Sequence, residues 1–408
     1  MRILINALSA ESLSGKHVLY GHLRQWAKWT RDEHDFHVFY NSATRPSEMQ
    51  MGPNVRWHEA PAEIRGWFQR SVWEATTLPR RMRELAIDFY FSPSGTILPH
   101  SPVPQAALAQ NPWCLTAEVP KGITGQAKAL IQRLAYRRTQ RSADVMIYNS
   151  HHMQQLYRQN AGGRLERNGL ILHQALDDET HEAAANARAT GTSREMTIVC
   201  VSVMARWKNC ETLLHALRRL RDRGINANLR LVGGWPDQHY RRQILAEIHG
   251  LNLHKCVSLE GHVSRETLYD AYRSAKAFCL LSRCESFGIP ALEAQAFGTP
   301  VVGSNTGAMA EIGGPGGVFV DPNDHLAAAV ALESMLVDPV HWQVLSCAAI
   351  ANAKQFRWEN CSRPLLNLQS AGVTASAADS TIAEANHALD GSGQVPVCQS
   401  LRNQKAAV

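Results

Sequence analysis

The sequence predicts an α/β protein made of two doubly wound domains, each a parallel sheet with helices on both faces. Short apolar runs of strand length alternate with helical segments along most of the 408 residues. Such alternation is typical of parallel sheets whose two faces are both covered. It occurs in two sets with a polar stretch between them, and the chain is long enough for two domains.

The first set of predicted strands lies in residues 1–180. Helices are expected between several of these strands, for example around 16–29 and 122–142. The predicted strands are RILIN (2–6), FHVFY (36–40), VRWHEA (55–60), DFYFSP (88–93), AALAQN (106–111), VMIYNS (145–150) and LILHQA (170–175).

The second set lies in residues 196–355. Its predicted strands are TIVCVSVM (197–204), LRLVGG (229–234), VSLEG (257–261), AFCLLS (277–282), PVVGS (300–304) and GVFVD (317–321). Helices are expected at 209–223, 237–249, 264–275, 290–297 and 323–337. Because ligands of open α/β sheets bind beyond the carboxyl ends of the strands, the active site is expected in the cleft between the domains.

The domain boundary is visible in composition. The stretch DDETHEAAANARATGTSREM (177–196) is polar and has no strand pattern, which places a linker at 181–195. From 371 to 408 the residues are mostly small and polar and show no periodic pattern, so a disordered tail is expected there.

Composition points to a cytoplasmic protein. Residues are 45% hydrophobic and 19% charged, as in soluble globular proteins. The net charge of +6 suits an anionic ligand or an acidic membrane surface. The nine cysteines contain no C-x-x-C pair, which indicates free thiols in a reducing compartment. No apolar stretch reaches the ~18 residues of a membrane span, and the N-terminal apolar run is too short for a signal peptide.

The stretch CESFGIPALEAQAFGTPVV (284–302) carries the most specific signal. It follows a predicted strand, and Pro290 fits the first position of a helix that ends before Gly298. A helix N-terminus favours anions, whereas the two carboxylates, Glu285 and Glu293, suit groups that donate hydrogen bonds. A ligand with both phosphates and hydroxyls is a nucleotide sugar. The alternative is two exposed carboxylates at a helix end, with Glu293 only complementing the helix dipole.

Glu285, seven residues and Glu293, with SFGIPALEA around them, resemble the E-x7-E motif of the retaining glycosyltransferases of family 4. The resemblance implies the GT-B fold. It also implies that Glu285 contacts the donor sugar and Glu293 the ribose. The motif residues expected at the donor are Ser286, Phe287, Gly288 and Ile289.

Other loops of the second domain also resemble this family. VSVMARWKNCETLL (201–214) provides Lys208 as the expected diphosphate-binding lysine, with Asn209 as a helix cap. The family's arginine position holds Val203, so Arg206 is the nearest substitute. LVGGW (231–235) and the G-x-V loop add Gly233, Gly234, His262 and Val263 as predicted donor contacts. The alternatives are solvated basic residues at a helix start and an exposed loop histidine.

In the first domain, the resemblance places a phosphate and acceptor loop at Ser14, Gly15 and Lys16. Gln110 and Asn111 occupy the acceptor-side position after the fifth strand. For both, an ordinary loop is the alternative. The family's closing helices resemble FRWENCSRPLLNLQS (356–370), which is expected to return to the first domain.

The segment KGITGQAKALIQRLAYRRTQR (121–141) has six basic residues and no acidic one. Its basic residues are Lys121, Lys128, Arg133, Arg137, Arg138 and Arg141. An apolar face alternates with them, so this helix could lie on an anionic membrane or simply cover its own sheet.

The sequence therefore predicts a retaining glycosyltransferase. It would move a hexose, with a weak preference for mannose from GDP-mannose, to a sugar or lipid-linked acceptor in polysaccharide assembly. No cofactor or metal is expected, and His151 and His152 lack partners spaced for one. No nucleic-acid partner is expected. A nucleotide-dependent oxidoreductase would need G-x-G-x-x-G after the first strand, which is lacking. A non-catalytic nucleotide-sugar-binding protein is the third reading.

Overall fold

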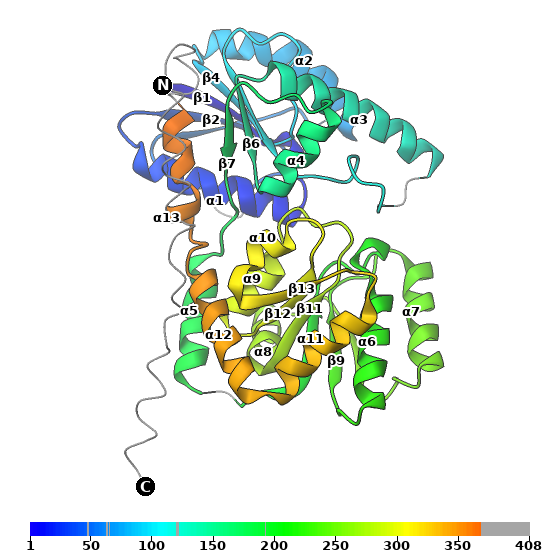
Figure 1. Ribbon diagram of the computed structural model, residues 1–408. Coiled ribbons are helices and arrows are strands. Elements are labelled where there is room, and N and C mark those ends of the chain that lie inside the picture. Colours follow the sequence, from blue (N-terminus) through cyan, green and yellow to red (C-terminus); the bar gives the residue numbers. More distant parts are fainter. Residues whose placement is uncertain (47–48, 63, 65, 120–121, 192, 369–408) are drawn as a thin grey trace.

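The computed structural model describes residues 1–46, 49–62, 64, 66–119, 122–191 and 193–368. The predicted tail, 371–408, and Lys121 lie outside the described residues. Figure 1 shows two α/β domains, one above the other, with the chain passing between them at one side. This is the predicted fold class of two parallel, helix-covered sheets.

The first domain contains a seven-stranded parallel sheet in the order β3-β2-β1-β4-β5-β6-β7. Its strands are β1 (Arg2–Asn6), β2 (Asp35–Tyr40), β3 (Val55–Glu59), β4 (Phe89–Ser92), β5 (Gln105–Ala109), β6 (Val145–Tyr148) and β7 (Gly169–Ile171). Its helices are α1 (Leu13–Trp29), α2 (Gly66–Glu84), α3 (Ile123–Ser142) and α4 (His151–Asn160).

Alternate side chains of each strand enter different cores, because successive residues of a strand point to opposite faces. Ile3 and Ile5 pack in one cluster with Trp26 of α1, whereas Leu4 packs in another with Leu78 of α2. Burial on both faces explains why the strands read as continuous apolar runs.

The second domain contains a six-stranded parallel sheet in the order β10-β9-β8-β11-β12-β13. Its strands are β8 (Glu195–Val201), β9 (Asn228–Val232), β10 (Val257–Gly261), β11 (Ala275–Leu280), β12 (Val301–Ser304) and β13 (Gly317–Val320). Its helices are α6 (Cys210–Asp222), α7 (Gln238–Gly250), α8 (Arg265–Ser274), α9 (Ile289–Ala296), α10 (Met309–Gly313), α11 (His325–Val337) and α12 (Pro339–Ala353).

Most of the segment predicted as a linker is helical. Helix α5 (Asp178–Ala189) covers residues 181–189 of it, and β8 begins at its last residue, Glu195. The helix is rich in alanine, with Asp178 and Glu179 in its first turn and Arg188 in its last. These charges complement the helix dipole, and alanine is the strongest helix former.

The closing segment returns to the first domain as α13 (Trp358–Cys361) and a 3-10 turn (Arg363–Asn367). Trp358 packs edge-on against the His22 ring of α1, with centroids 5.0 Å apart. His22 Nδ1 lies 2.8 Å from Ser362 Oγ. Leu365 and Leu368 join the first-domain core. The sequence predicted this return of residues 356–370 to the first domain. Residues 369–370 lie outside the described part of the chain.

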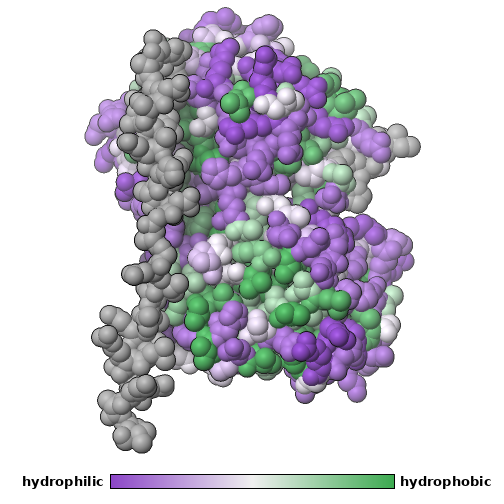
Figure 2. Space-filling model, viewed as in Figure 1, coloured by the Kyte–Doolittle hydropathy of each residue, from purple (hydrophilic) through white to green (hydrophobic). Residues whose placement is uncertain are grey.

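The surface of the second domain carries apolar side chains over α11 and α12 (Figure 2). The exposed ones are Leu326, Val330, Val337, Val340 and Val344. Within the described residues, no helix is long and apolar enough to cross a membrane.

Candidate active site

The loop between β11 and α9 is fixed by glycine. Gly288 has φ of 105°, and a Cβ built on it would lie 2.6 Å from Met309 Sδ. Only glycine fits this position without strain. Pro290 is the second residue of α9, one later than the sequence predicted, because Ile289 already has helical geometry.

Glu285 and Lys208 form an ion pair across this loop. Lys208 Nζ lies 2.5 Å from Glu285 Oε2, and both side chains are mostly buried. The backbone carbonyl of Glu285 accepts a hydrogen bond from Ala308 N at 3.1 Å. Gly307 allows this approach, since a Cβ there would lie 2.8 Å from the same oxygen. The structure therefore brings together two of the three residues predicted to carry the chemistry, Glu285 and Lys208 but not Arg206.

Asn209 precedes α6 in a left-handed conformation, with φ of 60° and ψ of 51°. The sequence predicted that the Asn209 side chain caps this helix, but it makes no capping hydrogen bond. Instead its Nδ2 donates to the carbonyls of Leu281, at 3.1 Å, and Pro322, at 2.5 Å. The buried Asn209 amide thereby connects the loop of Lys208 to the end of β11, which precedes Glu285.

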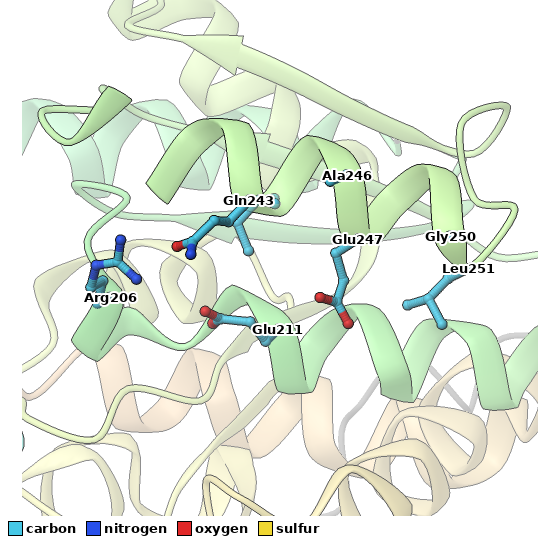
Figure 3. A pocket seen from close by; sticks show the side chains of 8 residues that line it. Arg206, Glu211, Gln243, Ala246, Glu247, Gly250 and Leu251 are labelled. Carbon is cyan, nitrogen blue, oxygen red and sulfur yellow. The ribbon is translucent and has the colours of Figure 1, made fainter. Parts of the chain in front are cut away.

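Arg206 lies apart from this pair. Its Nε is 3.3 Å from Asp237 Oδ2, and its guanidinium stands 5.1 Å from the centre of the Tyr240 ring. It lines a groove of about 620 Å³ between α6 and α7, which Glu211 and Glu247 enter from the two helices (Figure 3). The predicted diphosphate role of Arg206 would thus need its side chain to leave Asp237.

Glu293 lies on α9 and accepts a hydrogen bond from the hydroxyl of Tyr272 at 2.7 Å. Burial raises the pKa of the Glu293 carboxyl, although Tyr272, His17 and Arg265 act in the opposite direction. Glu293 is therefore not the exposed helix-end carboxylate of the alternative reading.

A cavity of about 460 Å³ lies between the two domains. It collects predicted residues from both: Ser14, Gly15, Gln110 and Asn111 from the first domain, and Glu285, Ser286, Phe287, Gly288 and Ile289 from the second. The α6–α7 groove contains only Arg206 of the predicted set. The interdomain cavity is therefore the candidate active site.

Eight predicted residues lie outside the cavity lining: Lys208, Arg206 and Glu293, described above, and five others. Lys16 is on the first turn of α1. Of the other four, Gly233 and Gly234 follow β9, and His262 and Val263 follow β10. Gly233 has φ of 138° and could not carry a Cβ, which would lie 1.8 Å from Ser202 O. A Cβ on Gly234 would lie 2.3 Å from His262 Nε2, so these two loops touch. Val263 follows His262.

The sequence reasoning missed several cavity residues, above all Arg70 of α2 and Gln174 after β7. Helix α2 was not predicted, although Arg70 and Glu74 are spaced as a helical ion pair. That spacing is the signal that could have identified the helix. Gln174 sits in a run that the sequence placed in a strand, whereas β7 ends at Ile171.

The two domains also touch beside the cavity. Ser150 Oγ donates to the Ser286 carbonyl at 3.0 Å. Glu311 of α10 accepts from the backbone N–H of His151, at 2.8 Å, and of His152, at 3.1 Å. His173 Nε2 lies 3.3 Å from the same carboxylate. Burial would raise the pKa of Glu311, but these donors hold it below its usual value.

Among the described residues, no group of three or more His, Cys, Asp or Glu side chains is placed to hold a metal ion.

Comparison with known proteins shows similarity to glycosyltransferases over part of the chain. The family model described as "Glycosyl transferases group 1" matches residues 184–355. O-antigen chain mannosyltransferase B of Escherichia coli is 38% identical over 107 residues, 26% of this chain and 28% of that protein. D-inositol 3-phosphate glycosyltransferase of Corynebacterium jeikeium is 34% identical over 183 residues, 43% of each chain. The chain thus aligns with less than half the length of either relative.

Two solved structures have the same fold. Sucrose-phosphate synthase from Thermosynechococcus elongatus has a TM-score of 0.71 at 19% identity, over 91% of this chain and 98% of that one. Anabaena HepE, solved in complex with UDP-glucose, has a TM-score of 0.66 at 18% identity, over 91% and 99%. The predicted GT-B fold is confirmed.

Proposed function

We propose that this chain, whose residues 184–355 match the glycosyl transferases group 1 family model and whose fold is GT-B, transfers a hexose from a nucleotide-diphosphate sugar, with retention, to a sugar or lipid-linked acceptor. The observation that carries this proposal is the ion pair between Lys208, in the turn before α6, and Glu285, which precedes α9 and lines the interdomain cavity. The cation suits the departing diphosphate, and the carboxylate suits the hydroxyls of the donor sugar.

The proposed chemistry is a same-face transfer. The bond from the sugar C1 to the diphosphate oxygen breaks, and a bond from C1 to the acceptor oxygen forms. The acceptor proton passes to the departing diphosphate, whose growing charge Lys208 stabilises. Among the described residues that line the cavity, Glu285 is the single carboxylate, and it is already paired with Lys208. This supports a leaving-group base over a protein nucleophile.

The roles of Glu293, Gly233, Gly234, His262 and Val263 in holding the nucleoside belong to the same proposal. A metal-independent reaction is also proposed, with Lys208 supplying the positive charge that a cation would otherwise provide. Mannose, as GDP-mannose, is favoured as the donor sugar because the E. coli relative is named a mannosyltransferase. The acceptor class stays open between a sugar chain and a phosphorylated cyclitol, the two kinds that the relatives' names mention.

Thermal-shift screening tests the donor proposal. A nucleotide that binds only the folded chain stabilises it by ~2.7 kcal/mol at 100 times its Kd. We expect a shift with one nucleoside diphosphate and release of that nucleotide from its sugar conjugate. No shift with any nucleoside diphosphate, together with no turnover of any nucleotide sugar, would contradict the proposal.

Peripheral contact with a membrane through α3 is a further part of the proposal. Leu130, Ile131 and Leu134 are each more than half exposed on this helix. Arg133 and Arg137, also exposed, lie beside them in sequence. An apolar strip with flanking basic residues is typical of helices that lie in a lipid interface.

A further inference from the structure

The first-domain wall of the interdomain cavity is built mainly of uncharged polar side chains. It includes the amides of Gln110, Asn111, Gln132 and Gln174 and several serine hydroxyls. Amides and hydroxyls both donate and accept hydrogen bonds, as sugar hydroxyls do. A phosphate only accepts, and it is bound best by cationic donors. The chemistry of this wall therefore matches an uncharged, hydroxyl-rich ligand.

One cation, Arg70, lines the cavity among the described residues, and it lies between two carboxylates. Its Nε is 3.4 Å from Glu74 Oε1, and its Nη1 is 3.8 Å from Glu11 Oε1. Nη1 also lies 3.4 Å from the carbonyl of Leu8, to which it donates. The two carboxylates offset the positive charge of Arg70 and so weaken its attraction for an anion.

Glu74 is also held in place by Asn6, on β1. Its side chain is 13% exposed and accepts a hydrogen bond from Asn6 Nδ2 at 2.8 Å. Asn6 is itself buried at the end of β1 and lies 3.1 Å from the Tyr90 hydroxyl. Removing Glu74 from Arg70 would break this buried network, and an unpaired buried polar group is costly. A phosphate therefore cannot readily displace Glu74 from its arginine.

We propose that the acceptor group that enters the cavity is an uncharged sugar, and that Glu74 and Glu11 exclude a phosphorylated one by neutralising Arg70. This rests on the proposed function and decides between the two acceptor classes left open above. Only the saccharide unit that receives the new bond needs to enter. A phosphate-bearing lipid at the far end of a longer acceptor is compatible with the proposal.

Binding of mannose 6-phosphate, measured by calorimetry in the presence of the nucleoside diphosphate, tests the proposal without requiring transfer. The wild-type chain is expected not to bind it at millimolar concentration. Glu74→Gln keeps an oxygen for Asn6 but removes the charge, and it should bind mannose 6-phosphate at least tenfold more tightly. Glu11→Gln, on the exposed side of Arg70, should act in the same direction with little effect on folding.

Glu84→Gln is the matched control, since Glu84 pairs with Arg81 at 2.7 Å on the same helix but does not line the cavity. It should behave as wild type. Binding of mannose 6-phosphate by the wild-type chain would overturn the proposal, as would a failure of both Glu74→Gln and Glu11→Gln to gain affinity. Nucleotide release from the donor, measured separately, reports on the proposed function alone.

Discussion

Lys208 Nζ and Glu285 Oε2 lie 2.5 Å apart, with 14% and 15% of their side chains exposed. Each residue neutralises the other while the cleft is empty, so neither is an unpaired buried charge, which would be strongly destabilising. In the proposed reaction the diphosphate of the donor binds Lys208, and the hydroxyls of the donor sugar bind Glu285. Donor binding would therefore replace the ion pair between the two residues.

Lys208→Ala is expected to lower kcat more than it raises the donor KM, because the charge that Lys208 meets grows in the transition state. The loss should be roughly 100-fold or more in kcat. Initial rates over a range of donor concentrations measure both constants. Lys354→Ala, at an exposed position on the second domain, is the control. An increase in KM with kcat unchanged would limit Lys208 to binding the ground state.

Glu293→Ala is expected to weaken binding of the nucleoside diphosphate by roughly 1–3 kcal/mol, since it removes an acceptor for ribose hydroxyls. Tyr272→Phe serves as the comparison, because it removes only the hydroxyl that holds Glu293. Its effect on affinity should be smaller. Calorimetric titration measures both variants, and an unchanged Kd in Glu293→Ala would remove the ribose role.

Glu311→Ala is expected to favour a more open arrangement of the two domains. The carboxylate satisfies the backbone N–H groups of His151 and His152 at the start of α4 across the interface. Loss of two charge-assisted hydrogen bonds should cost about 1–3 kcal/mol of interdomain contact. Small-angle scattering should then give a larger radius of gyration than for wild type or for Glu266→Ala, an exposed α8 control. Identical scattering of Glu311→Ala and wild type would show that the Glu311 contact does not hold the domains together.

The His17–Asp177 pair should make stability depend on pH. Burial alone would lower the pKa of His17, but the hydrogen bond to Asp177 and its charge raise it above 6.5. Burial would raise the pKa of Asp177, but the hydrogen bond and charge of His17 hold it below 3.8. The pair's stabilisation is therefore present between these values. It is lost as pH rises through the raised pKa of His17 or falls through the lowered pKa of Asp177.

Asp177→Asn should accordingly lower the Tm more at pH ~6 than at pH ~8.5. Differential scanning fluorimetry at the two pH values measures this difference. Asp324→Asn is the matched control, because Asp324 caps α11 through the N–H groups of Leu326 and Ala327. Its effect should be similar at both pH values. An equal Tm loss at both pH values for Asp177→Asn would mean that His17 does not contribute.

The membrane proposal predicts that the chain sediments with phosphatidylglycerol vesicles at low salt, and less so at physiological salt, where charges are screened over ~8 Å. Arg137, Arg138 and Arg141 donate to backbone carbonyls of their own domain, so replacing them would also disturb packing. Joint replacement of Leu130, Ile131 and Leu134 by serine is the cleaner variant and should abolish sedimentation.

Val340→Ser with Val344→Ser, on the exposed face of α12, controls for general loss of apolar surface and should sediment as wild type. Wild-type chain that stays in the supernatant at low salt would show that α3 only covers its sheet.

The strands, and the loops that hold Glu285 and Lys208, could be predicted because their signals are local, whereas the ion pair between the two residues was not predicted. A buried parallel strand is a continuous apolar run, and both residues lie in the loops after such runs. Arg70 could not be placed in the same way, because it reaches the cavity from a helix that follows a different strand. Arg206 faces Asp237 because of how α6 and α7 pack, which the loop sequence does not encode. The tie from Asn209 to Pro322 likewise depends on a contact 113 residues away.

The chain crosses between the domains twice, and the two crossings are joined: Leu176 and Arg357 form a parallel bridge, and Leu176 N donates to the Phe356 carbonyl at 3.0 Å. Two adjacent connections joined by hydrogen bonding are expected to resist sliding and twisting but to allow bending about the line they share. We therefore expect the domains to move relative to each other mainly by opening and closing of the cleft. Cutting the chain near 195 would not release an intact second domain, since residues 356–368 would remain attached to it while their packing partners were lost.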